Sequence, residues 1–217
     1  MDPVTHGLLG AAVGQAFYAR RLGWRRAVTW GALGAMLPDV DVLAVPFGGP
    51  LGEWRFHRAA THALWLVPLA GVALGEGARR LAAWRDERAG RASPQASRAT
   101  WLGLLTLSLL SHPLLDLMTT WGIQLFWPSR ARLALDAVPI VDVFYTGLLL
   151  LAALVGRWSF GARPALARRV AATALAASTA YLGYGYLLNA RAAAEARRQL
   201  AVDGWGQARV DAYPTLL

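Results

Sequence analysis

The chain has 217 residues, of which 56% are hydrophobic and only 16% are charged, and its mean hydropathy is +0.35. A soluble domain is on average about 45–50% apolar and about 25% charged, so this composition favours a membrane-embedded protein. Cysteine is absent, which excludes disulfides and thiolate ligands and leaves only His, Asp and Glu to hold a metal ion. All 22 basic residues behind the net charge of +9 are arginines, and they fall between apolar stretches. That distribution fits membrane topology better than nucleic-acid binding.

Six apolar stretches are candidates for membrane-spanning helices. A hydrocarbon core about 30 Å thick needs about 20 apolar residues at about 1.5 Å each. The stretches are 5–19, 27–46, 62–78, 100–118, 140–157 and 167–189. None of them shows the alternation with a period of two that is typical of strands. The sequence therefore predicts an all-α fold, a polytopic transmembrane helix bundle of about five or six spans.

Some of these spans are expected to be short or kinked. The first carries Gly7, Gly10 and Gly14, which favour close helix packing or, alternatively, a half-membrane helix. In the fourth, Pro113 removes a backbone hydrogen bond, so we expect a kink beside His112. The N-terminus has neither a basic region nor a small-residue cleavage site, so we expect no cleaved signal peptide.

The chain is expected to form one transmembrane domain with a short tail. The domain covers residues 1–189 and includes a cytoplasmic linker, 79–98, whose arginines and Ser93-Pro94-Gln95 sequence favour a flexible loop. Residues 190–217 form the C-terminal tail, in which the last helix is expected to continue to about residue 200. We find no repeat and no second domain.

The arginines predict the orientation. Fourteen of them follow the first, third and fifth stretches, and only four lie in the opposite loops. The fourteen are Arg20, Arg21, Arg25, Arg26, Arg79, Arg80, Arg85, Arg88, Arg91, Arg98, Arg157, Arg163, Arg168 and Arg169. Because cytoplasmic loops carry an excess of basic residues, this bias predicts that the N-terminus lies outside the cytoplasm.

Histidine and aspartate gather in short clusters at the non-cytoplasmic ends of the predicted spans. Imidazole nitrogens and carboxylate oxygens are ligands of zinc-like ions, and ionisable groups within apolar segments point to function. The candidate metal ligands are His6, Asp39, Asp41, His57, His62, His112, Asp116 and Asp142. The orientation is predicted from the arginines alone. That the histidines and aspartates all fall on the same side of the predicted membrane therefore independently supports one shared site.

Each cluster also has a simpler interpretation. His112 and Asp116 are spaced to share one helix face, where the alternative to metal ligation is a single interhelical hydrogen bond. His57 and His62 flank Arg58 just before a span, where the alternative is solvation at the membrane interface. Arg58 is a candidate clamp for an anionic substrate, and a contact with a lipid headgroup is the alternative.

The carboxylates have structural alternatives as well. Asp39 and Asp41 can chelate one ion or bridge two, although Pro-Asp-x-Asp is also a common turn. Asp2 followed by Pro3 is typical of a helix N-cap. Asp142 is a ligand, a partner that orients a histidine, or the N-cap of the fifth span.

At these residues the chain resembles the LexA-regulated, membrane-bound metal-dependent hydrolases of bacterial inner membranes. The matching motifs are Asp2-Pro-x-Thr-His6, Pro38-Asp-x-Asp41, His57-Arg-x-x-Thr-His62, His112-x-x-x-Asp116-x-x-Thr119, Gly122, Pro128-Ser129 and Asp142. They run in order over about 140 residues, and Ala59 and Ala63 depart from the Gly and Ser of the pattern without touching a ligand. The arrangement is faintly similar to zinc-dependent phospholipases C.

The residues and the resemblance together predict a multi-pass inner-membrane hydrolase with its active site on the non-cytoplasmic side. We expect two divalent ions, zinc before manganese, with Asp39, Arg58 and Asp116 as catalytic residues. The lipid bilayer is the expected partner, a phospholipid or other amphiphilic phosphoester the expected substrate, and nucleic acid is not expected. The alternatives are a metal-ion or proton transporter that uses the same ligands, and a non-catalytic protein whose metal only joins helices.

Overall fold

The computed structural model describes residues 1–91 and 96–214, and within these ranges the chain is helical and has no strand. The predicted all-α class is confirmed. The α-helices are α1 (Pro3–Val13), α2 (Ala19–Leu22), α3 (Trp24–Met36), α4 (Gly52–Phe56), α5 (Leu66–Arg88), α6 (Arg98–Leu117), α7 (Val143–Ser159) and α8 (Pro164–Val202). A π-helix, η1 (Gly14–Tyr18), joins α1 to α2, and two 3-10 helices, η2 (Leu37–Leu51) and η3 (Ala60–His62), precede and follow α4.

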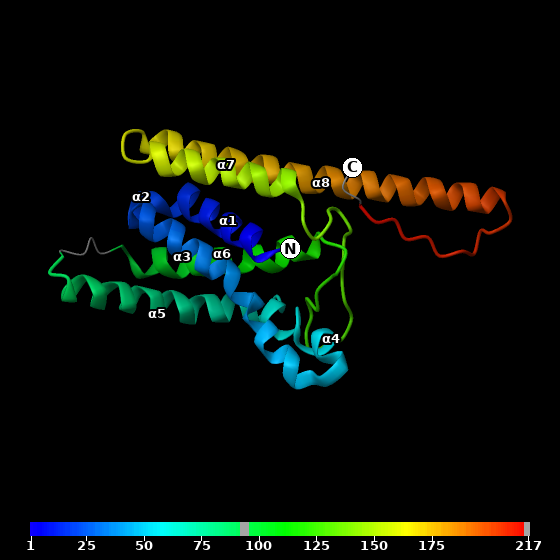
Figure 1. Ribbon diagram of the computed structural model, residues 1–217, viewed down its shortest axis with the longest axis horizontal. Helices are drawn as coiled ribbons and strands as arrows, with labels where there is room; N and C mark the ends of the chain where they lie inside the picture. Colours follow the sequence, from blue (N-terminus) through cyan, green and yellow to red (C-terminus); the bar gives the residue numbers. More distant parts are fainter. Residues whose placement is uncertain (92–95, 215–217) are drawn as a thin grey trace.

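The longer helices pack as antiparallel pairs (Figure 1). α5 packs on α6, α1 on α3, and α7 on α8. The pair α1–α3 lies in the middle, because α3 also packs on α6 while α1 also packs on α7. α8 extends well beyond the bundle, so the predicted continuation of the last helix to about residue 200 is confirmed.

The glycines of the first stretch hold α1 and α3 in close contact. A Cβ atom on Gly10 would collide with the backbone carbonyl of Gly31, and one on Gly14 would collide with that of Ala27. The chain reverses between the two helices at Gly23, whose φ of 78° lies in the left-handed region that glycine adopts without strain. The predicted close packing of the first helix is therefore confirmed.

Two helical stretches of the described chain are long and apolar enough to cross a membrane. They are the continuous stretch Trp24–His62 and α6, and α7 is a shorter apolar helix. Leu69 on α5 and Leu151 on α7 expose 63% and 58% of their surface. An apolar exterior of this kind fits contact with lipid better than contact with water.

The structure differs from the sequence predictions in the linker. α5 continues to Arg88, so the first half of the predicted loop 79–98 is helical. Glu76 pairs with Arg79 and Arg80 one turn later, and the Arg88 guanidinium lies 4.4 Å from the Trp84 ring centre. These contacts between neighbouring turns stabilise the helix. Ser93, Pro94 and Gln95 lie outside the described residues.

The fourth stretch forms a single helix. α6 runs from Arg98 to Leu117 with Pro113 inside it, and the kink expected there stays a prediction. α3 and α5 both pack on α6 and support it from two sides. His112 and Asp116 stand one turn apart on this helix, and their predicted common face is confirmed.

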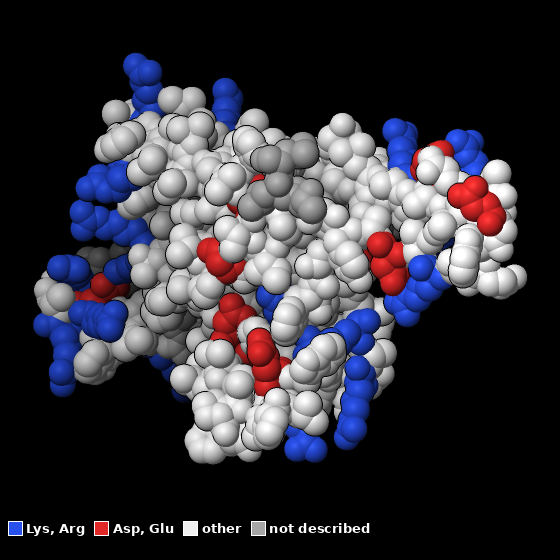
Figure 2. Space-filling view, turned by 45° about the vertical axis from the view of Figure 1, so that its right-hand side comes forward, with Lys and Arg blue, Asp and Glu red and all other residues white. Residues whose placement is uncertain are grey.

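The two ends of the bundle differ in charge. α2, the end of α5 and the turn between α7 and α8 lie at the left in Figure 1, and α2, the last turn of α5 and the last turn of α7 carry arginines. Figure 2 shows a group of arginines at its left, besides others at its right and lower side. The opposite end holds the N-terminus, η2, η3 and the last turn of α6, which carry the histidine and aspartate clusters. The predicted gathering of these clusters at one end, away from the arginine-rich loops, is confirmed.

Candidate metal centre

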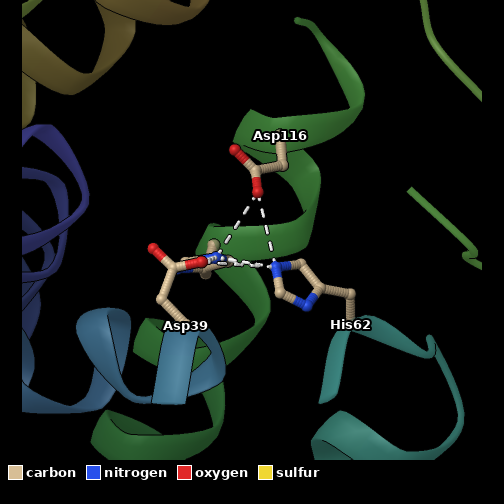
Figure 3. A group of neighbouring side chains, drawn as sticks. Asp39, His62 and Asp116 are labelled. Carbon is tan, nitrogen blue, oxygen red and sulfur yellow. Dashed lines mark hydrogen bonds and ion pairs between the residues drawn. The ribbon is translucent and has the colours of Figure 1, made fainter. Parts of the chain in front are cut away.

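Four side chains from three elements converge at the end of the bundle opposite the arginines. Asp39 comes from η2, His62 ends η3, and His112 and Asp116 lie on α6. Figure 3 shows Asp39, His62 and Asp116 pointing toward one another. One ligand atom from each of the four lies within 4.8 Å of every other. We call Asp39, His62, His112 and Asp116 the inner group.

The distances within the inner group suit a metal ion. The Nε2 atoms of His62 and His112 are 2.9 Å apart, and both face Asp116 Oδ2, at 3.4 and 3.5 Å. Asp39 Oδ1 lies 3.3 Å from His112 Nε2 and 3.8 Å from His62 Nε2. Four ligands around one tetrahedral ion with bonds of about 2.0–2.2 Å would be about 3.3–3.6 Å apart. The separations in the inner group lie around that range.

The hydrogen bonds of His62 and His112 leave the Nε2 lone pair of each ring directed at the centre of the inner group. His112 Nδ1 lies 2.6 Å from the carbonyl oxygen of Ala35, which can only accept, so Nδ1 carries the proton. The Thr61 hydroxyl donates to Asp41, so it accepts from His62 Nδ1–H at 3.0 Å. Metal-binding histidines are oriented in this way, with one ring nitrogen donating to a fixed partner.

The two carboxylate oxygens of the inner group differ in their partners. Asp39 Oδ1 and Asp116 Oδ2 are buried without a hydrogen bond, but Asp116 Oδ2 has an ion pair with Arg58 Nε at 3.1 Å. The two imidazole lone pairs and Asp39 Oδ1 repel one another, and a cation between them would relieve that repulsion, because buried charge must be paired. The donor set of two nitrogens and two oxygens suits zinc and also manganese or iron. The residues present therefore fit a divalent ion.

A second set of possible ligands adjoins the first. Asp39, Asp41 and His57 also offer ligand atoms within 4.8 Å of one another, and we call them the outer group. Here Asp41 already has partners: it accepts from the Arg58 backbone at 2.9 Å and from the Thr61 hydroxyl at 2.5 Å, and lies 2.8 Å from His57 Nδ1. Asp39 belongs to both groups, which is the position of a bridging carboxylate in a two-ion site.

Arg58 lies beside the inner group. It has a φ of 59°, a left-handed conformation unusual for a residue other than glycine, and it is buried. Its Nε is 3.1 Å from Asp116 Oδ2, and its Nη1 donates to the Thr119 hydroxyl at 3.3 Å. The guanidinium therefore pairs with the same Asp116 oxygen that faces His62 and His112.

His6 lies in contact with the inner group but outside it. Its ring stacks on that of His112, with centroids 3.6 Å apart, and its Nε2 is 3.1 Å from Asp116 Oδ1. The Met1 amino group bonds to the same oxygen. His6 therefore contacts Asp116 and His112 through its ring and its Nε2 atom, whereas its Nδ1 atom has no hydrogen-bond partner. Its role as a ligand stays a prediction.

Asp142 lies apart from both groups. Its Oδ1 accepts from the Tyr145 backbone at 2.8 Å and its Oδ2 from the Tyr181 hydroxyl at 2.8 Å, so that it caps α7. Of the three alternatives for Asp142, the N-cap is confirmed. Asp2 likewise caps α1, where it accepts from the Thr5 backbone at 3.0 Å, as predicted.

Three contributions to the site have no clear signal in the sequence. The carbonyl of Ala35 and the hydroxyl of Thr61 determine which nitrogen of each histidine is free; Ala35 has no signal, and Thr61 stands in the matching motif with no role assigned to it. Arg132 donates to the backbone carbonyls of His57 at 2.9 Å and Gly122 at 3.3 Å and so joins two loops. The signal that could have identified Arg132 is its position as one of only four arginines in the loops on the non-cytoplasmic side.

Comparison with known proteins places the chain among bacterial membrane proteins. A family model described as YdjM inner membrane protein matches residues 1–192. The chain is 36% identical over 127 residues to the inner membrane protein YbcI of Escherichia coli (strain K12), a match that covers 57% of this chain and 64% of that protein. No solved structure matches the chain. These names state a location and no activity.

Proposed function

The chain belongs to the YdjM inner membrane protein family, and we propose that it is a metal-dependent hydrolase with a two-ion His/Asp centre. The observation that carries the proposal is the pair of Nε2 atoms of His62 and His112, which are 2.9 Å apart. Both face Asp39 Oδ1, which has no hydrogen bond, and Asp116 Oδ2, which has an ion pair with Arg58 but no hydrogen bond. A buried arrangement of this kind is costly without a cation.

We extend the proposal to membrane topology. Five to six segments cross the bilayer, and the arginine-rich end faces the cytoplasm because of the positive-inside bias. The metal centre then lies near the non-cytoplasmic leaflet. Control of expression by LexA is implied by the resemblance of the motifs, and transcript levels in a LexA-deficient strain test it.

Each residue of the centre has a role in the proposed reaction. His62, His112 and Asp116 would hold an inner ion, Asp41 and His57 would hold an outer one, and Asp39 lies close enough to both sets to contribute to each. Bound divalent ions would lower the pKa of a water molecule toward neutrality and polarise the bond to be cleaved.

Two side chains act on the substrate itself. Asp39 is the most accessible carboxylate of the inner group, with 15% of its side chain exposed, and would orient the water molecule that the ions activate. Arg58 holds an anionic group of the substrate, since its planar guanidinium pairs with two oxygens of a phosphate at once.

An apolar pocket beside the centre favours an amphiphilic substrate. The pocket has a volume of about 140 Å³ and lies between η2 and α5. Its lining includes Pro38, Val40, Thr61, Leu66, Val67 and Leu109. Pro38 adjoins Asp39, and Thr61 bonds to Asp41, so an acyl chain in this pocket would bring its headgroup toward the ions. We therefore propose a lipid phosphoester as the substrate class.

The test is hydrolysis by the full chain, purified in detergent and loaded with zinc or manganese. Phospholipids and a short soluble phosphoester are offered side by side. We expect phosphate or headgroup release from the lipid, at least 100-fold slower in Asp116→Asn than in wild type. Asp203→Asn, which removes an exposed carboxylate at the end of α8, is the control and should retain full activity.

Two outcomes would contradict parts of the proposal. Full activity on the soluble ester with none on lipids would exclude the lipid substrate. Metal-loaded protein that moves zinc or protons across proteoliposomes without hydrolysing any phosphoester would favour the transporter alternative.

A further inference from the structure

A second pocket lies at the arginine-rich end of the bundle, far from the metal centre. It has a volume of about 540 Å³ and is open to the outside. The turn between α2 and α3 forms one wall, and the end of α7 forms the other. Its lining includes Trp24, Arg25, Arg26, Arg157, Trp158 and Phe160, with no carboxylate among the lining residues. A volume of this size suits a small-molecule ligand.

The positive charge of this pocket is only partly neutralised. Arg26 pairs with Asp86, which lies outside the pocket. Arg25 and Arg157 are exposed, and within the described part of the chain neither has an ion pair with a carboxylate. Two guanidinium groups from different helices thus face one opening without counter-charge, an arrangement suited to an anion.

A buried glutamine, Gln15, holds the Trp24 wall of the pocket in place. The Trp24 indole donates to Gln15 Oε1 at 3.1 Å, and the Gln15 amide donates to the carbonyls of Ala152 at 3.3 Å and Ala167 at 2.9 Å. Gln15 is 1% exposed and lies in the π-helix η1, where it fills the space left by Gly156. Trp24 is therefore tied to α7 and α8 before any ligand arrives.

We propose that this pocket binds the headgroup of an anionic phospholipid. The phosphate would pair with Arg25 and Arg157, while Trp24 and Trp158 would lie along the glycerol and the first acyl carbons. Basic pockets between membrane helices bind such headgroups, and tryptophan is enriched at the membrane interface. The aromatic walls favour a lipid over free phosphate, because Trp158 exposes 75% of its surface beside the two charges. This inference is independent of the metal centre and its chemistry.

The test is lipid retention by the full chain in native mass spectrometry and in vesicle titrations. Vesicles contain either phosphatidylglycerol or phosphatidylcholine. We expect wild type to retain phosphatidylglycerol and the double variant Arg25→Gln/Arg157→Gln to bind it at least about tenfold more weakly, since each arginine near an anionic lipid contributes about 1 kcal/mol. The matched control is Arg20→Gln/Arg169→Gln, which removes the same charge from exposed positions of α2 and α8 outside the pocket.

A steric variant separates the pocket from general surface charge. Gly161 lines the pocket, and a Cβ atom added there meets no atom within 4 Å, so we expect Gly161→Leu to narrow the opening without disturbing the fold. We expect it to reduce phosphatidylglycerol retention while every arginine remains. The proposal is overturned if the control and pocket double variants lose phosphatidylglycerol equally, or if Gly161→Leu retains it as wild type does. It is also overturned if inorganic phosphate, at the same concentration as the lipid, competes with it.

Discussion

The inner and outer groups contain the same kinds of side chain and share Asp39, but they differ in how far their atoms are already satisfied. In the inner group, Asp39 Oδ1 has no hydrogen bond, Asp116 Oδ2 has an ion pair with Arg58 but no hydrogen bond, and two histidine lone pairs face each other. In the outer group, Asp41 accepts from a backbone amide and a hydroxyl. A metal ion relieves repulsion in the inner group, whereas it must displace an existing contact in the outer group. We therefore expect the inner ion to bind more tightly.

The largest effect should come from removing an inner ligand. His112→Ala leaves Asp39, His62 and Asp116 without their fourth partner, and we expect metal affinity at the inner position to fall by more than about 100-fold, beyond the usual effect of losing a supporting contact. His57→Ala is the matched comparison and should lose the outer ion while the inner one stays. Metal content after dialysis against a weak chelator measures both, and equal losses in the two variants would contradict the ranking.

A smaller loss, spread over both positions, is expected from Asp39→Asn. The amide keeps the shape of the side chain but removes the negative charge that both ions share. We expect the outer ion to be lost and the affinity for the inner ion to fall by about 10–100-fold. Titration with zinc in a competition assay measures both. A variant that loses only one ion and binds the other normally would show that Asp39 does not bridge.

Thr61→Val should act mainly through His62. Without the hydroxyl, Nδ1 of His62 loses its acceptor and the ring is free to carry its proton on Nε2. Asp41 also loses one contact but keeps the one from the Arg58 backbone. We expect about a tenfold weaker inner site and a smaller effect at the outer position. Thr179→Val on α8 removes a hydroxyl that bonds only to its own helix, and zinc affinity should be unchanged in it.

The smallest effect is expected from Asp142→Asn. Asparagine caps helices about as well as aspartate, so stability should fall by about 1 kcal/mol or less as the charged acceptor of the Tyr181 hydroxyl is lost. Thermal unfolding in detergent measures this, and metal content should equal that of wild type. Loss of an ion from this variant would return Asp142 to the list of ligands.

Much of the fold could be predicted because the responsible signals are local. Apolar stretches predict helices, Asp2 before Pro3 predicts a cap, and glycines at Gly10 and Gly14 predict close packing, all of which the structure confirms. The helical continuation of α5 was missed, since arginine density suggests a loop. Its stability depends on pairs such as Glu76 with Arg79, which a composition count does not reveal.

The site was predictable in its residue types but not in its internal arrangement. The spacing of His112 and Asp116 predicts a shared helix face, and the arginine count places the clusters at one end. The sequence does not separate inner from outer ligands, because Asp39 and Asp41 differ only in where the turn of η2 directs them. Nor does it predict that Ala35 supplies the carbonyl that orients His112.

Metal content is the most direct test of the central claim. The full chain, purified in detergent, is measured by inductively coupled plasma mass spectrometry beside the double variant His62→Ala/His112→Ala. The account predicts about two zinc or manganese ions per chain in wild type, as in two-ion sites, with the inner ion absent from the variant. Wild-type protein that stays metal-free after reconstitution with zinc and with manganese would contradict it, and would leave the histidines as a polar network that joins helices.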